Sequence, residues 1–290
     1  MSAVAHPVKY FQPAIDNAID CSSGLLAMLE GVYGSPMVHA TLDDVGTKDR
    51  DGISAVVGYV TYSEQWRKFN WRWKITLEQL KVPYLHTTEH LNKFPLIGGS
   101  GLTDDDVYTI LTPFIAAVRE HLIDGGAFGV SVITEWDAYE KLTDKEKKFI
   151  RPPDVHSFEM AIGLAAKRMS NVLDPDNCMS VQLDESHDAP KYFAAYEIMK
   201  ARNETLRRYL SALCFCDDKL HPPVQAADML GNLLLKAWRS YKANGGWPKA
   251  FKELVLPEGR TNVKQLVYDF DALKELARMR MDAHDRMAIE

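Results

Sequence analysis

The sequence predicts an α/β protein in which a mixed β-sheet carries helices on its faces. In the second half of the chain, runs rich in apolar and β-branched residues alternate with segments of helical periodicity, which favours parallel strands joined by right-handed crossovers. Near the start, two strand-like runs flank a short segment that begins and ends in glycine, which favours an antiparallel pair. A composition of 46% hydrophobic and 26% charged residues is typical of a globular chain.

The first half of the chain is expected to supply the antiparallel part of the sheet. β-Branched residues crowd the second strand, and the helix after it carries aromatic residues on one face, with Ser63 as its expected N-cap. The expected elements are strands 37–43 and 53–62 around a hairpin turn at 46–52, helix 63–80, a strand-like run 82–86, helix 103–123 and strand 127–134.

The second half is expected to add parallel strands and their crossover helices. Pro222 and Pro223 suit the first turn of a helix, and Gly245 suits its end. The expected elements are a helix from Asp154 to about residue 173, strand 179–184, helix 191–206, strand 210–216, helix 224–241 and a final helix 271–288. We therefore expect a helical N-terminal extension over 1–36, the sheet domain over 37–245 and a helical C-terminal tail over 246–290.

Charge and cysteine content limit the classes of function. The net charge of −6 disfavours a protein that binds nucleic acid over its whole surface and restricts such contact to a local patch. The four cysteines form no C-x-x-C pair, which argues against a zinc ribbon or a thioredoxin-like centre. No basic and then apolar leader is seen and no apolar stretch approaches ~18 residues, so we expect a cytoplasmic protein outside the membrane.

Acidic residues stand at the ends of two expected strands. Asp43 and Asp184 both fall on the more polar side of their strands, because side chains alternate along a strand. Parallel neighbours ~4.8 Å apart would let these carboxylates share one cation. Asp44 with Glu185 would pair equally well on the other face, and periodicity alone does not choose between the two pairs. In open α/β sheets, ligands bind beyond the carboxyl ends of strands, where all four residues lie.

Two acidic residues on helices can complete this set. Glu159 lies in the first turns of the helix after Asp154, and Asp228 lies on helix 224–241, each near small residues that permit close packing on a sheet. Ligands that are all oxygen suit Mg²⁺ or Mn²⁺ rather than zinc, and two such ions can stabilise the attacking and leaving oxygens of phosphodiester hydrolysis. Taken singly, an acid at a strand end is usually a turn former, and an acid near a helix start, such as Glu159, usually complements the helix dipole.

Four motifs, taken in order, resemble a known family. They are LDDVG at 42–46 with VVGYV after it, PYLHTTEHL at 83–91, VQLDES at 181–186 and PVQAADMLGNLL at 223–234. Together, over about residues 37–240, they resemble the bacterial and phage family known as domain of unknown function 3800. That family is regarded as RNase H-like, so the resemblance implies an RNase H-like mixed sheet flanked by helices, and either a metal-dependent nuclease or a degenerate relative of one.

The resemblance also implies which residues form the site. It carries over Asp43, His86, Asp184 and Asp228, and Glu159 is added by analogy with the helix-borne glutamate of RNase H-like folds. One departure concerns position 45, where a valine stands in place of the family's usual serine. A hydroxyl there would be able to orient a water, so its loss favours a non-catalytic relative.

Two further patterns have alternative interpretations. His86, Glu89 and His90 match the H-x-x-E-H pattern of zinc peptidases, but the strand-like run before them and two threonines argue against the helix that this motif needs. His86 is then either an auxiliary group near the carboxylates or a structural histidine. On helix 63–80, bases alternate with aromatics, as in a surface that stacks and neutralises a nucleic-acid strand. However, Trp66, Phe69 and Trp73 lie on the apolar face of this helix, so packing in the core is favoured over base stacking. The remaining candidates for phosphate contact are Arg67, Lys68, Arg72 and Lys74.

The sequence thus favours a nuclease that hydrolyses DNA or RNA by a two-metal carboxylate mechanism, with Mg²⁺ or Mn²⁺ as cofactor. Its metal ligands are expected to be Asp43, Asp184, Asp228 and Glu159, with His86 as a further catalytic residue. The alternative is a non-catalytic RNase H-like protein for binding or assembly, which Val45 and the acidic net charge favour, and a zinc peptidase is a distant third. The charged final helix 271–288 is a candidate surface for a homo-oligomer.

Overall fold

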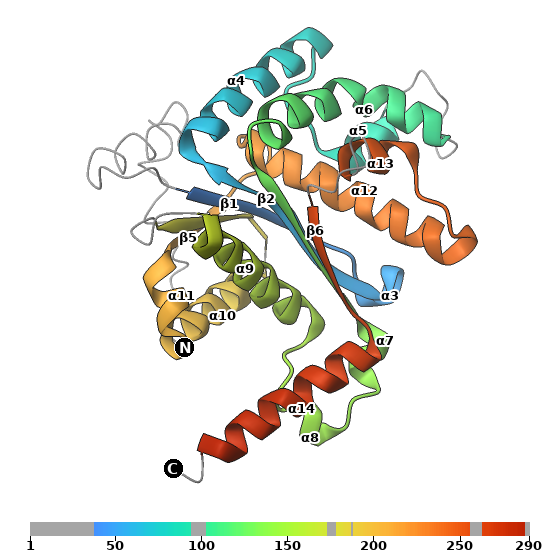
Figure 1. Cartoon of the computed structure of the whole chain (residues 1–290). Coiled ribbons are helices and arrows are strands. Elements are labelled where there is room, and N and C mark those ends of the chain that lie inside the picture. The colour runs from blue at the N-terminus through green and yellow to red at the C-terminus, as the bar shows by residue number, and fades with distance from the viewer. Residues whose placement is uncertain (1–37, 94–102, 173–177, 187, 256–262, 288–290) are drawn as a thin grey trace, which may run out of the picture.

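A computed structural model describes residues 38–93, 103–172, 178–186, 188–255 and 263–287 of the chain. The expected N-terminal helical extension lies outside these residues. Within them, six strands form one mixed sheet in the order β5-β4-β1-β2-β3-β6, with helices on both faces (Figure 1). The strands are β1 (Val38–Val45), β2 (Ile53–Tyr62), β3 (Phe128–Glu135), β4 (Met179–Asp184), β5 (Leu210–Cys216) and β6 (Val263–Tyr268).

The strand directions confirm the predicted α/β class. β1 pairs with β2 and β2 pairs with β3, both antiparallel, whereas β4 lies parallel to β1 and β5 lies parallel to β4. This places the hairpin strands beside the crossover strands in a single sheet. β6 extends the other edge, parallel to β3.

Two apolar layers cover the sheet. One layer packs α4 (Ser63–Leu80), α6 (Asp104–Val118), α12 (Pro222–Asn244) and α13 (Lys249–Val255) on the face of β2 that carries Ala55, Val57 and Tyr59. The opposite layer packs α9 (Pro153–Val172) and α10 (Ala189–Arg202) on Val38, Ala40 and Leu42 of β1. Side chains along β1 and β4 therefore alternate between the face that α12 covers and the face that α9 and α10 cover. The residues that lie between the apolar ones of these two strands, which are mostly polar, face α12.

Several local details differ from the expectations. The expected turn at 46–52 contains a short helix, α3 (Lys48–Asp51), whose C-cap Gly52 has φ 66°. Tyr62, rather than Ser63, is the N-cap residue of α4, because the Ser63 hydroxyl pairs with the His39 ring at 2.9 Å. The expected helix 103–123 ends in a π-helical turn, Arg119–Ile123, and the expected helix 191–206 is two helices, α10 and α11 (Glu204–Tyr209).

The C-terminal tail is also more than a helical extension. Its strand β6 joins the sheet, and only then does α14 (Phe270–Met287) begin, close to the predicted start of the final helix. The strand was missed because two polar residues, Lys264 and Gln265, interrupt its short apolar run. α14 packs through Leu273 and Ala277 on the segment that contains α7 (Trp136–Glu140) and α8 (Asp144–Lys147).

Candidate carboxylate site

The ends of β1 and β4 bring two predicted acids together. Leu42 pairs with Leu183 in the parallel register, so Asp43 and Asp184 are the next residues of adjacent strands. Thr41 and Gln182 lie two residues before Asp43 and Asp184, on the same face of the sheet, and there the Thr41 hydroxyl donates to the Gln182 side-chain oxygen at 3.0 Å. Asp43 and Asp184 therefore share this face. Asp43 is 6% exposed and lies under α12.

The alternative pair is not assembled in the same way. Asp44 belongs to the opposite face, where its carboxylate accepts a hydrogen bond from the Tyr192 hydroxyl of α10 at 2.9 Å. Glu185 is exposed, and its N–H donates to the Cys216 carbonyl at 2.9 Å. Of the two pairs that the sequence allowed, the structure therefore gathers Asp43 and Asp184 on the side that α12 covers.

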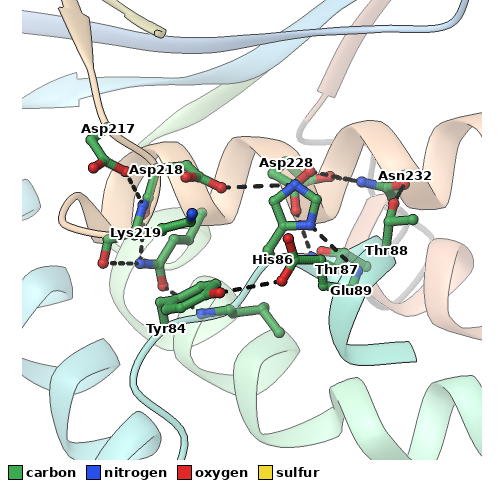
Figure 2. A network of polar contacts seen from close by, with 12 residues as sticks. Tyr84, His86, Thr87, Thr88, Glu89, Asp217, Asp218, Lys219, Asp228 and Asn232 are labelled. Carbon is green, nitrogen blue, oxygen red and sulfur yellow. Dashed lines mark hydrogen bonds and ion pairs between the residues drawn. The ribbon is translucent and has the colours of Figure 1, made fainter. Parts of the chain in front are cut away.

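α12 contributes the third carboxylate, Asp228. This residue is 9% exposed, and it accepts hydrogen bonds from the Thr87 N–H at 2.8 Å and from the Asn232 side-chain amide at 2.8 Å (Figure 2). The helix can approach the sheet closely because residue 231 is glycine. A Cβ added there would lie 2.5 Å from Val45 Cγ1, so any larger residue would push α12 away from β1.

His86 reaches the same region from the segment before α5 (Thr87–Lys93). Its Nε2 lies 3.9 Å from Asp218 Oδ2, and Asp218 follows the end of β5 (Figure 2). Sequence analysis missed Asp218. The signal that was available is its position just beyond the carboxyl end of a parallel strand, which is the same argument that selected Asp184.

Gln225 holds the two segments that carry His86 and Asp218. Its side-chain oxygen accepts hydrogen bonds from the Leu85 N–H at 3.0 Å and from the Trp73 indole at 2.8 Å, and its amide donates to the Asp218 carbonyl at 2.8 Å. This glutamine is 1% exposed. With Asp228 one turn later and Asn232 after it, α12 presents a polar row that fixes the site's loops.

Burial and mutual repulsion shape the electrostatics of the site. Burial, and then the charges of Asp228, Asp44 and Asp184, raise the pKa of Asp43 well above its ordinary value. Burial, and then Asp218, raise the pKa of Asp184 to about 7. Burial also raises the pKa of Asp228, although the hydrogen bonds from Thr87 and the charge of His86 oppose this rise. The carboxylates thus lie close enough to disfavour one another's charge, which a bound cation would relieve.

Glu159 does not belong to this cluster, and the expectation that it joins the other ligands is wrong. It lies on α9, which covers the opposite face of the sheet. Its nearest ionic partner is Arg151, with Arg151 Nε 3.7 Å from the carboxylate. Burial raises the pKa of Glu159, and Arg151, Arg280 and Arg202 oppose the rise. Its surroundings are therefore arginines rather than carboxylates.

The expected aromatic core of α4 is present, and its bases lie outside it. Trp66, Phe69 and Trp73 are buried and contact one another in sequence. Three of the four candidate bases, Arg67, Lys68 and Lys74, are exposed, and Arg72 is half-buried with its Nε 3.7 Å from Glu120. Trp71 is 66% exposed on the outer side of the same helix.

A helix, α5 (Thr87–Lys93), follows His86, contrary to expectation, and contains Glu89 and His90 but not His86. α5 begins at Thr87, directly after His86, because the Asp228 carboxylate accepts the Thr87 N–H in the manner of a capping group. Glu89 accepts a hydrogen bond from the Tyr84 hydroxyl at 3.2 Å. The side chain of His90, the other histidine of the pattern, lies outside the described part of the chain.

Comparison with known proteins adds no family to this description. No protein-family model matches the chain, and no curated protein matches it either. The resemblance to domain of unknown function 3800 therefore stays a prediction from the motifs.

The donor set indicates which ion this region would suit. In the residues that the structure describes, no group of three or more His, Cys, Asp and Glu side chains is arranged so that it could hold a metal ion. Each of the carboxylates Asp43, Asp184, Asp218 and Asp228 nevertheless lies within electrostatic range of at least two of the others. An oxygen-only set of this kind fits a hard cation such as Mg²⁺ or Mn²⁺.

Over the described residues, no helix has the length and apolarity needed to span a bilayer.

Proposed function

We propose that this chain is a metal-dependent nuclease with an RNase H-like fold, active on the phosphodiester bonds of DNA or RNA. The observation that carries the proposal is the convergence of Asp43, Asp184 and Asp228, from two strand ends and one helix, into a region where the charges of Asp184 and Asp228 disfavour that of Asp43 and the charge of Asp228 disfavours that of Asp184. Distant acids gathered at such a cost in electrostatic energy are typical of a cation site rather than of packing.

The sheet supports the fold assignment. An antiparallel β1-β2-β3 half beside parallel strands β4 and β5 is compatible with the RNase H-like arrangement that the motifs imply. The acids also stand where such a sheet would present them, at the carboxyl ends of the adjacent parallel strands β1 and β4.

Mg²⁺ or Mn²⁺ would be held by Asp43, Asp184 and Asp228, and when bound it would neutralise the charge that develops on the phosphate during hydrolysis. The chain's own residues prepare this region. The Thr87 N–H and the Asn232 amide orient the Asp228 carboxylate. His86, which faces Asp218, is placed to hold or move a proton at its Nε2. Asp218 is in range to orient His86 and to add negative charge beside Asp184.

The second candidate function is a non-catalytic protein for binding or assembly with the same fold. One observation favours it: Val45, where the resembling family usually has serine, is packed against the helix at Gly231 and offers no hydroxyl to the site. The acidic net charge of −6 points the same way. Under either function a cytoplasmic location and self-association through α14 remain predictions.

Cleavage assays with matched variants test the nuclease. Asp43→Asn and Asp228→Asn should abolish cleavage of labelled DNA and RNA in Mg²⁺ or Mn²⁺, while Glu159→Gln, which changes an acid on the other face, should cleave like the parent. Calorimetric titration with Mn²⁺ should show binding to the parent and to Glu159→Gln but weak binding to Asp43→Asn. Normal cleavage by Asp43→Asn would reject the proposed site, and a parent that neither cleaves nor binds Mn²⁺ would favour the non-catalytic alternative.

A further inference from the structure

The chain between β5 and α12 makes a rigid turn at the edge of the carboxylate cluster. The Lys219 N–H donates to Asp217 Oδ1 at 2.9 Å, and the Leu220 N–H donates to the Asp217 carbonyl at 3.1 Å. From the other side, the buried Gln225 amide donates to the carbonyls of Asp218 and Lys219 at 2.8 and 3.3 Å. Hydrogen bonds on both sides therefore fix the backbone of this turn, and with it the directions of the side chains.

The turn sends its side chains in two directions. Asp218 faces His86 and the cluster, whereas Lys219 and Leu220 face solvent beside it. Leu220 is 67% exposed, and Lys219 Nζ lies 5.7 Å from the centre of the Tyr84 ring (Figure 2). Exposed apolar side chains are common when scattered singly, but this one is held on a fixed turn two residues from a site carboxylate. A cation, an aromatic ring and an apolar side chain thus adjoin one edge of the acids.

We propose that Lys219 and Leu220 contact the nucleic-acid strand whose phosphodiester lies at the carboxylates. Lys219 binds a phosphate of that strand, and Leu220 packs against the adjoining sugar and base. This inference rests on the proposed nuclease function and names the element that recognises its substrate.

Charge explains why such an element is needed. A chain of net charge −6 repels a polyanion wherever no metal ion is bound, so a cation at the rim favours binding of the strand beside the metal site. The Tyr84 ring limits where the Lys219 ammonium can go, which reduces the entropy lost on binding. Because Gln225 fixes the turn before any strand arrives, Leu220 presents its apolar surface without rearrangement.

Fluorescence anisotropy with short, fluorescein-labelled single-stranded DNA and RNA tests this element. The full chain carries Asp184→Asn to prevent turnover, and binding is measured in Mg²⁺ over a range of salt concentrations. Lys219→Gln should weaken binding about fivefold for every sequence and reduce the slope of log affinity against log salt by about one. Leu220→Ser should weaken binding about threefold and leave that slope unchanged, because it removes apolar contact only.

The matched controls are Lys264→Gln, an exposed cation on the edge strand β6 at the other side of the sheet from β4, and Met279→Ser, an exposed apolar residue on α14. Both should bind like the Asp184→Asn parent. If all four variants bind alike, Lys219 and Leu220 are not the substrate contact, although the nuclease proposal stands on its cleavage assay. If the parent binds neither DNA nor RNA, the strand contact is rejected, and the nuclease proposal is decided by its cleavage assay alone.

Discussion

Replacing Asp184 with asparagine should stabilise the metal-free protein at alkaline pH. In the folded chain, burial and the Asp218 charge hold the pKa of Asp184 at about 7, against an ordinary value of 3.8. The folded state therefore binds this proton more tightly than the unfolded state does. The resulting stabilisation is fully present below about pH 4 and is lost as the pH rises through about 7. Asparagine keeps the shape of the side chain but has no charge to lose or gain.

The size of the effect follows from the same two values. The difference between about 7 and 3.8 corresponds to about 4 kcal/mol when the group is fully shielded. Asp184 is only partly buried, and screening by solvent reduces this to about 2 kcal/mol. For a chain of this size, that gain should raise the melting temperature by about 4 °C at pH 8.

Thermal and urea denaturation in EDTA, at pH 5 and pH 8, would measure this gain. The parent should lose stability between the two pH values, and Asp184→Asn should lose less. Asp124→Asn, which changes an exposed aspartate in the turn before β3, serves as the control and should follow the parent. Addition of Mg²⁺ at pH 8 should stabilise the parent more than the variant. An Asp184→Asn protein that is less stable than the parent at pH 8 would refute the argument that repulsion among the acids dominates.

Three further predictions concern the packing around the site. Gln225→Met should lower the free energy of unfolding by about 2 kcal/mol in urea melts, because it leaves the buried Leu85 N–H and Trp73 indole without acceptors. An unchanged urea midpoint would contradict the stabilising role of these two hydrogen bonds. Gly231→Ala should destabilise by about 1–3 kcal/mol through its clash with Val45, and combining it with Val45→Ala should restore most of the loss in the same melts. His39 should stay neutral until the pH falls toward 4, since burial lowers the pKa of His39 to about 4. Nuclear magnetic resonance of the parent would follow this titration, with His39→Gln used to assign the His39 signal, and a His39 that titrates near pH 6.5 would contradict its burial.

Most of the sheet follows from local patterns. β2, β4 and β5 begin and end where their β-branched and apolar runs do, and the alternation of Val181 and Leu183 with Gln182 and Asp184 already assigns each side chain to a face. Parallel pairing of β1 with β4 then follows from crossover geometry. β6 did not follow, because a six-residue edge strand with two central polar residues gives too short a pattern.

The site was predictable only in part, for a related reason. Asp43 and Asp184 lie on strands, so the alternation of side chains and the shared carboxyl edge of parallel strands predict from the sequence that they are close together. The choice against Asp44 depends on which helix covers which face, and that is settled by the Tyr192 hydroxyl of α10. Glu159 was misplaced by the same uncertainty, since helical spacing says which side of α9 is apolar but not which face of the sheet it covers.

The segment before α5 shows a different limit. Residues 82–86 have a strand-like pattern, and two threonines follow, which disfavours a helix on propensity alone. The helix forms where groups of α12 accept hydrogen bonds around its N-terminus: Asp228 accepts the Thr87 N–H, Gln225 accepts the Leu85 N–H just before the helix, and Asn232 accepts the Thr88 hydroxyl. Tertiary hydrogen bonds thus override local preference, and no window of sequence contains them.

The cost of the carboxylates is itself an argument about their role. Asparagine at position 228 would still accept the Thr87 N–H and would remove a charge that Asp43 must oppose. The same holds for Asp184, whose neighbour Asp218 raises its pKa. A set of acids that served only to tie loops together would therefore be improved by neutral residues of the same shape. Only a positively charged partner turns their mutual repulsion into a gain, because each carboxylate then contributes attraction to one ion. The free energy of unfolding of the parent should accordingly rise more on addition of Mg²⁺ at pH 8 than on lowering the pH from 8 to 5 in EDTA. A larger rise with Mg²⁺ indicates a cation site, whereas a larger rise on protonation indicates an acidic cluster with a structural role.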